Sequence, residues 1–96
     1  MKDILVFCFD ETAYKDCLRT LIPQLEHTHK IKFEHVLNTY YSTKFRITPL
    51  LDPSDFSGKN DFDIVFYKNW EENKHLAKIM KIYKNSKRIH KETIIK

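Results

Sequence analysis

Two adjacent carboxylates, Asp10 and Glu11, are the first residues in this sequence whose types and position could support chemistry. They follow an apolar run, Ile4–Phe9, that predicts a β-strand, and open α/β sheets bind ligands at the carboxyl ends of their strands. Paired carboxylates at such an edge could hold a divalent cation through their oxygen atoms. We favour the alternative that Asp10 or Thr12 caps the following helix, because Asp and Thr are preferred at that position.

Histidines and cysteines are the other residues with metal-binding or nucleophilic potential. His27 and His29 lie close together in the sequence, but a zinc site needs three or four converging ligands. We therefore interpret these two side chains, together with His35, as solvated. Cys8 and Cys17 belong to apolar segments, which predicts buried reduced thiols rather than nucleophiles. From these patterns we predict no catalytic residue, no metal site and no cofactor.

Basic residues are concentrated in the last third of the chain. Residues 1–67 contain 8 Lys+Arg and 10 Asp+Glu, a net charge of −2, whereas residues 68–96 contain 9 and 3, a net charge of +6. Such a segment can neutralise phosphates and release counterions, and lysines contact the nucleic-acid backbone rather than reading its sequence. The expected contact residues are Lys74, Lys78, Lys81, Lys84, Lys87, Arg88 and Lys91, and the aromatic residues that could add base stacking are Tyr40, Tyr41 and Trp70.

The basic segment also has two interpretations without a binding role. Lysines opposite an apolar stripe are the ordinary pattern of a solvated helix face. The chain is rich in Lys, Ile, Asn, Phe and Tyr, whose codons are A+T-rich, so genomic bias could also raise the lysine content. The salt dependence of binding to RNA or heparin would separate a binding surface from a solvated face.

The N-terminal half predicts one buried strand, one helix and two further strands. Ile4–Phe9 is apolar throughout, as expected for a strand buried on both faces. The helix spans Asp10–Leu25, and Pro23 should kink or end it, since proline lacks the N–H group for an intrahelical bond. Strand character returns in Ile31–Leu37 and Tyr41–Ile47, with a hairpin turn between them. The helix residues that form one apolar stripe are Tyr14, Cys17, Leu18, Leu21, Ile22 and Leu25.

The C-terminal half predicts a loop, a second buried strand and a second helix. Pro49–Asp61 has the turn-forming composition of a long loop, and Asp63–Tyr67 is apolar enough for a buried strand. Glu71–Lys87 predicts a helix for which Asn69 is a suitable cap. Arg88–Lys96 is either a final edge strand or a tail. The apolar side of the second helix is expected to carry Leu76, Ile79, Met80 and Tyr83.

The order of these elements, β-α-β-β-β-α with an optional final strand, predicts a single α/β domain over residues 1–96. We expect one small open sheet of four to five strands with two amphipathic helices; the alternative is a β-α-β-β-α-β two-layer sandwich with both helices on one face. The single glycine, Gly58, excludes a Gly-rich phosphate loop. No signal peptide and no apolar run of the roughly 18 residues that span a membrane is visible, so we expect a cytoplasmic protein without membrane contact.

Ile4–Glu11 with its helix, together with Phe62–Asn69, resembles a response-regulator receiver domain. In that family the first strand ends in an acidic pair that binds magnesium, and Asp10 and Glu11 match this pair. The family's phosphoacceptor aspartate falls here on Lys68, which cannot form an acyl phosphate. The later strands, with their hydroxyl and lysine switch residues, have no counterpart in this sequence. The resemblance therefore implies a degenerate receiver-like fold without phosphotransfer.

A second resemblance begins at Asn38–Ser42, which contains Tyr-Tyr-Ser, and extends to Asp63–Tyr67. This stretch is similar to the pseudo-GTPase domain of alpha- and gamma-adaptin-binding proteins. That family carries a Tyr-Tyr-Ser motif before a strand and binds clathrin-adaptor subunits. The family's final strands have no counterpart here. The resemblance implies an α/β fold and a protein partner.

Two functional hypotheses follow from these observations. The first is a small, non-enzymatic basic protein that binds RNA or a ribonucleoprotein surface, such as the ribosome, through its C-terminal lysine-rich helix and tail. The second is a protein-interaction module with a degenerate receiver-like or pseudo-GTPase-like fold.

Overall fold

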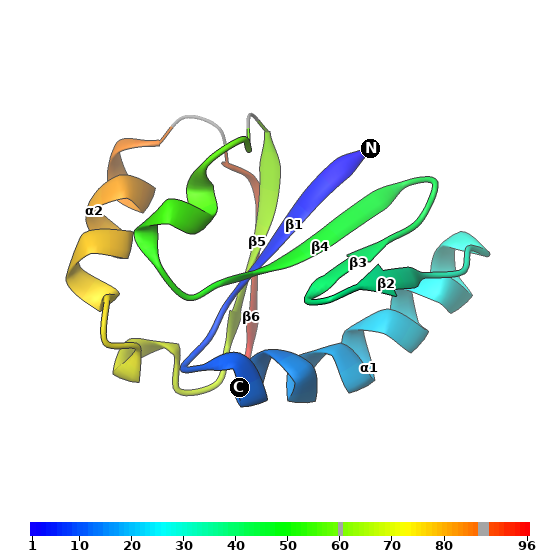
Figure 1. Cartoon of the computed structure of the whole chain (residues 1–96), viewed down its shortest axis with the longest axis horizontal. Coiled ribbons are helices and arrows are strands. Elements are labelled where there is room, and N and C mark those ends of the chain that lie inside the picture. Colours follow the sequence, from blue (N-terminus) through cyan, green and yellow to red (C-terminus); the bar gives the residue numbers. More distant parts are fainter. Residues whose placement is uncertain (60, 87–88) are drawn as a thin grey trace.

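The computed structural model of the chain describes residues 1–59, 61–86 and 89–96, except for the side chain of residue 90. These residues form one six-stranded sheet with the strand order β2-β3-β4-β1-β5-β6, flanked by two α-helices (Figure 1). This architecture confirms the predicted α/β class, although the sheet has more strands than the expected four to five. In chain order the elements are β1 (Lys2–Phe7), α1 (Glu11–His29), β2 (Glu34–Val36), β3 (Thr39–Tyr41), β4 (Phe45–Leu50), the 3₁₀-helix η1 (Pro53–Phe56), β5 (Phe62–Tyr67), the 3₁₀-helix η2 (Trp70–Glu72), α2 (Leu76–Asn85) and β6 (Ile89–Ile95).

Four neighbouring strands, β4, β1, β5 and β6, form the parallel part of the sheet. β1 lies between β4 and β5, and β6 pairs with the other side of β5. β2, β3 and β4 form an antiparallel meander at the opposite edge. Parallel neighbours need crossover connections, and α1 with the β2–β3 hairpin links β1 to β4, while α2 links β5 to β6.

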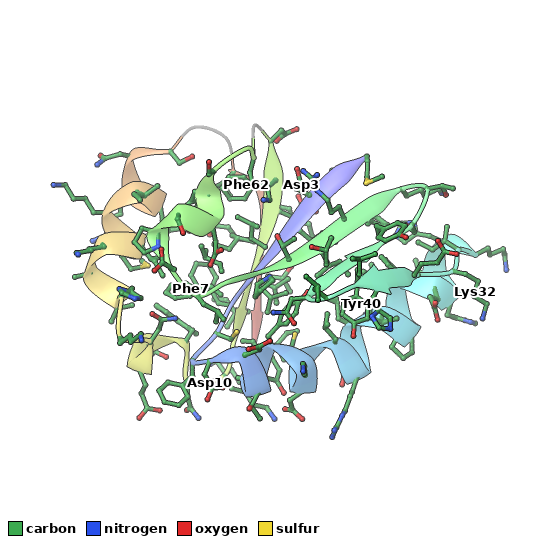
Figure 2. The ribbon with its side chains drawn as sticks, viewed as in Figure 1. Asp3, Phe7, Asp10, Lys32, Tyr40 and Phe62 are labelled. Carbon is green, nitrogen blue, oxygen red and sulfur yellow. The ribbon has the colours of Figure 1, made fainter. Side chains whose placement is uncertain are left out.

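The two α-helices cover opposite faces of the sheet (Figure 1). On β1, Ile4 and Val6 belong to the core under α1, whereas Leu5 and Phe7 belong to the core under α2 and η1. Phe7 is labelled in Figure 2. Successive side chains of a strand point to opposite faces, so a strand covered on both sides is apolar at every position. Because β1 is covered on both faces, the sequence run that predicted it is continuously apolar. The alternative two-layer sandwich, with both helices on one face, is wrong.

We expected Pro23 to kink or end the helix; helix α1 continues to His29, so the expectation that it ends near Pro23 is wrong. Proline removes only one intrahelical hydrogen bond, and apolar side chains on both sides of Pro23 still pack on the sheet, among them Leu21 and Leu25. The helix ends at His29, and the next residue, Lys30, is its C-cap, with a left-handed backbone and an N–H that donates to the carbonyl of Glu26.

The predicted strand Tyr41–Ile47 is two strands joined by a turn. Ser42 Oγ accepts hydrogen bonds from the N–H groups of Lys44 (3.1 Å) and Phe45 (3.0 Å), which stabilises the reversal between β3 and β4. A hydroxyl that bonds nearby N–H groups favours a turn over a continuous strand. The loop predicted from Pro49 begins later, because β4 extends to Leu50 and the loop then contains η1.

The predicted helix Glu71–Lys87 is shorter than expected, because η2 precedes α2 and α2 begins at Leu76. Asn69 precedes η2 but makes no side-chain capping bond. Of the two interpretations of Arg88–Lys96, the structure shows a strand, β6, which pairs in parallel with β5. Lys87 and Arg88 themselves lie outside the described residues. Within the part of the chain that the structure describes, no helix has the length and apolar character needed to cross a membrane.

Candidate functional site

A hollow of about 540 Å³ lies at the carboxyl edge of the parallel strands. The connection after β1 leads to the face covered by α1, whereas the connections after β4 and β5 lead to the opposite face. Such a change of direction opens a crevice at the strand ends, which is where α/β sheets bind ligands. The residues that line the hollow follow β1, follow β4 or precede α2: Phe9, Asp10, Glu11, Leu51, Asp52, Asn73, Lys74 and His75.

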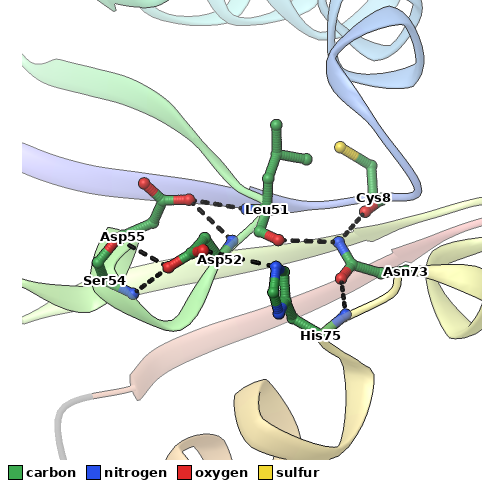
Figure 3. Close-up of polar contacts among 7 residues, drawn as sticks. All are labelled: Cys8, Leu51, Asp52, Ser54, Asp55, Asn73 and His75. Atoms are coloured by element: carbon green, nitrogen blue, oxygen red, sulfur yellow. Dashed lines mark hydrogen bonds and ion pairs between the residues drawn. The ribbon is translucent and has the colours of Figure 1, made fainter.

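The side chain of Asn73 forms hydrogen bonds to three of the segments that line this hollow (Figure 3). Its side chain is 5% exposed, and its Nδ2 donates to the carbonyl oxygens of Cys8 (2.9 Å) and Leu51 (3.3 Å). Its Oδ1 accepts a hydrogen bond from the N–H of His75 at 2.7 Å. One buried amide therefore connects the end of β1, the end of β4 and the residue before α2.

Asp52 and Asp55 fold the segment after β4 into the rim of the hollow (Figure 3). Asp52 Oδ1 accepts from Ser54 N (2.9 Å) and Ser54 Oγ (2.8 Å), while Asp55 Oδ2 accepts from Leu51 N (2.9 Å) and Asp52 N (3.0 Å). This reciprocal arrangement is a capping box. The hydrogen bonds from Ser54 hold the pKa of Asp52 below its usual value, and His75, whose Nε2 lies 3.5 Å from Asp52 Oδ2, contributes a smaller lowering.

The paired carboxylates predicted from the sequence line the same hollow but have different surroundings. Asp10 Oδ1 accepts a hydrogen bond from Ala13 N at 2.9 Å, so the favoured interpretation of Asp10 as the helix cap is confirmed. Glu11 is exposed and has no side-chain partner among the described residues. No group of three or more His, Cys, Asp or Glu side chains in this part of the chain is arranged to hold a metal ion.

Four of the predicted basic residues form one exposed surface, which we call the lysine face: Lys74, Lys78, Lys81 and Lys84. The opposite side of α2 packs against the sheet, with Ile79 fully buried and Leu76, Met80 and Tyr83 around it, as the periodicity predicted. None of the ion pairs in the described part of the chain includes a member of the lysine face. Among the described residues these lysines are therefore exposed cations outside any ion pair, although Lys78 lies near enough to Asp52 to contribute to the lowering of its pKa.

Lys91 does not belong to the lysine face, although it is close to α2 in the sequence. It pairs in register with Asp63 and lines a separate hollow with Leu25 and His29 of α1. Lys91 is thus on the face of the sheet that α1 covers, opposite the face that α2 covers. Two further predicted contact residues, Lys87 and Arg88, lie outside the described residues.

The three aromatic residues predicted to stack on bases do not join the lysine face. Trp70 packs on Phe7 and Phe66, with ring centroids 5.5 Å and 4.9 Å away, so its ring is partly buried against the core. Tyr40 and Tyr41 lie on β3, toward the opposite edge of the sheet from α2 (Figures 1 and 2).

His27 and His35 are exposed and His29 is half-buried, whereas both cysteines are buried. The ring of His29 packs against Phe45, and the ring of His35 stacks on Tyr40, so these side chains do not converge. Burial raises the pKa of Cys8 to about 12 and that of Cys17 to about 11. A thiol that keeps its proton at neutral pH is a poor nucleophile, which supports the prediction that both thiols are buried and unreactive.

The sequence patterns did not predict three polar residues that interact in the lining of the hollow: Asn73, Asp52 and His75. The one local signal was Asp52-Pro-Ser-Asp55, a capping-box spacing before a short helix. Nothing in the sequence pairs Asn73 with residues that lie far away along the chain. Comparison with protein-family models, with curated protein sequences and with solved structures finds no match for this chain.

Proposed function

We propose that this chain is a non-enzymatic RNA-binding domain that contacts the phosphate backbone of RNA, or of a ribonucleoprotein surface, through the lysine face. The observation that carries the proposal is that the lysines of this face are exposed and that none of them belongs to an ion pair within the described part of the chain. From Lys74 to Lys91, both included, the sequence has seven Lys and Arg residues and no Asp or Glu. Nothing within this segment therefore neutralises its positive charge.

Several other cations of the chain are already paired. Arg46 Nε lies 2.6 Å from Asp3 Oδ1, Lys68 Nζ lies 3.7 Å from Asp16 Oδ2, and Lys2 contacts Asp63 at 3.9 Å. An incoming phosphate would have to compete with those carboxylates. On the lysine face it meets exposed ammonium groups that belong to no ion pair among the described residues, and the release of its condensed counterions favours binding.

The geometry of α2 favours contact with a phosphate chain rather than with bases. The side chains of Lys78, Lys81 and Lys84 follow one another at about 4.5 Å along the helix axis, from a rise of about 1.5 Å per residue. A lysine contributes a point charge without the planar donors that read a base edge. We therefore expect the lysine face to bind RNA with little dependence on sequence and with strong dependence on salt.

The test is a charge-matched pair of triple variants. Lys78→Gln, Lys81→Gln and Lys84→Gln together should weaken RNA binding and lower the slope of log affinity against log salt by up to about 0.7 per lost phosphate contact on single strands. The control replaces three exposed lysines elsewhere, Lys15, Lys32 and Lys44, with glutamine and so removes the same charge. Equal affinities of the two variants at every salt concentration would show that only net charge matters and that the lysine face is not a binding surface.

A second candidate function, a protein-interaction module, is favoured by the apolar residues at the edges of the sheet. Val36 and Leu37 at edge strand β2 are 60% and 90% exposed, and Ile94 on edge strand β6 is 65% exposed. Open edges with apolar side chains can pair with a strand of another chain. Affinity purification from the native cell separates the two functions: recovery of ribosomal RNA and ribosomal proteins supports the first, and a single dominant protein partner supports the second.

A further inference from the structure

The hollow and the lysine face meet at Lys74, which lines the hollow and also begins the row of exposed lysines. Helix α2 starts beside the hollow, so an RNA strand bound along its outer side reaches the mouth of the hollow. Proteins recognise single-stranded RNA by stacking its unpaired bases on aromatic rings and by bonding to their Watson–Crick edges. The position of the hollow therefore suits a base whose phosphate is held at Lys74.

The hollow offers an aromatic surface for stacking. Phe9 is 50% exposed and lines the hollow, although phenylalanine is usually buried in a domain with a core as apolar as this one. Leu51 adds a second apolar side chain to the lining. The volume of about 540 Å³ lies within the range of roughly 300–1,000 Å³ that small-molecule sites occupy.

The polar groups of the hollow determine which base fits. Asp10 Oδ1 is engaged with Ala13 N, and both oxygens of Asp52 face partners, Ser54 on one side and His75 on the other. Glu11 is the carboxylate that has no partner in the described part of the chain. Its two oxygens are acceptors, so it repels a phosphate and attracts a group that presents N–H donors.

Guanine presents two adjacent donors on its Watson–Crick edge, N1–H and N2–H, which match the two oxygens of a carboxylate. Adenine and cytosine present one amino group beside an acceptor nitrogen, and uracil presents one N–H between two carbonyl oxygens. A charge-assisted bidentate pair is stronger and more specific than a single neutral hydrogen bond. We propose that the hollow binds one unstacked guanine of a single-stranded RNA, with Glu11 bonding to its Watson–Crick edge and Phe9 stacking on its face. This inference rests on the proposed RNA-binding function and adds a base preference to it.

The test uses fluorescence anisotropy with labelled uridine oligonucleotides that differ in one central nucleotide: uridine, guanosine, adenosine, cytidine or inosine. The guanosine oligonucleotide should bind at least about fivefold more tightly than the all-uridine one, which is the lower end of what a bidentate contact discriminates. Inosine lacks the N2 amino group and should lose most of this preference. Glu11→Gln should reduce the ratio of the two affinities to about one, because the amide replaces one acceptor with a donor.

Two further variants separate base recognition from backbone binding. Phe9→Ala should weaken binding of the guanosine oligonucleotide more than that of the all-uridine one, whereas Lys81→Gln should weaken both equally and leave their ratio unchanged. Equal affinities of the wild type for all oligonucleotides would overturn the base site and leave the proposed RNA-binding function intact. A guanosine preference that survives both Glu11→Gln and Phe9→Ala would also overturn it. No binding to any oligonucleotide would overturn the proposed function and the base site together.

Discussion

Replacing Asn73 with alanine tests whether one buried amide holds the edge of the sheet to α2. The substitution removes three hydrogen bonds, two donated to the carbonyl oxygens of Cys8 and Leu51 and one accepted from the N–H of His75. A hydrogen bond contributes about 0.5–1.5 kcal/mol net, and a buried group left without a partner costs about 1–3 kcal/mol. Because Cys8 is fully buried, we expect a loss of about 2–4 kcal/mol in the free energy of unfolding.

The assay is urea unfolding followed by circular dichroism, with a thermal melt as a second measurement. For a domain of this length, about 1 kcal/mol corresponds to roughly 4–8 °C in Tm, so Asn73→Ala should lower Tm by more than about 8 °C. Asn85→Ala is the matched control, because Asn85 is an exposed residue at the end of α2 and should change stability by less than about 0.5 kcal/mol.

Asn73→Asp separates the hydrogen bonds from the volume of the side chain. The aspartate keeps the shape of asparagine but at neutral pH lacks the Nδ2 donor and turns an acceptor toward two carbonyl oxygens. It should therefore be at least as destabilising as alanine. The reasoning fails if Asn73→Ala unfolds at the same urea concentration as Asn85→Ala, or if Asn73→Asp is as stable as the wild type.

Two other predictions concern the core. Phe66→Ala should cost about 3–5 kcal/mol, because Phe66 is 5% exposed and packs on Phe7, Trp70 and Tyr83; a melting temperature equal to that of the wild type would contradict its place in the core. Stability should fall as pH rises from about 9 toward 12, because the folded state keeps the protons of Cys8 and Cys17, with pKa values of about 12 and 11, whereas the unfolded thiols lose theirs near 9.0. Unfolding at pH 8 and pH 10.5 measures this loss, and Cys17→Ala should reduce it; an equal loss in wild type and variant would exclude the thiol as the cause.

The sequence determined the elements whose residues alternate or repeat with a clear period. The apolar runs of β1 and β5 and the apolar stripes of α1 and α2 were all predicted, because burial on a strand or a helix face leaves a local pattern. The role of Asp10 as a cap was likewise predicted, since a cap bonds to a backbone group only three residues away. The exposed side of α2 followed from the same periodicity.

Only the tertiary structure decided which of these residues lie together. Lys91 follows the lysine face in the sequence, yet the alternation of side chains along β6 places it on the opposite face of the sheet. Trp70 packs against Phe7 and Phe66 and is partly buried there, a contact that no local sequence pattern predicts. Local periodicity describes one element at a time, whereas a surface depends on which elements pack against each other.

The hollow at the carboxyl edge is the clearest case of this difference. Its lining comes from the ends of β1 and β4 and from the segment before α2, and Asn73 reaches Cys8 and Leu51 across long stretches of chain. Sequence patterns identified Asp10 and Glu11 as residues at the end of a strand, but not what faces them. Hydrogen bonds between distant backbone groups leave no periodic trace in the sequence, because a single amide at one position satisfies them.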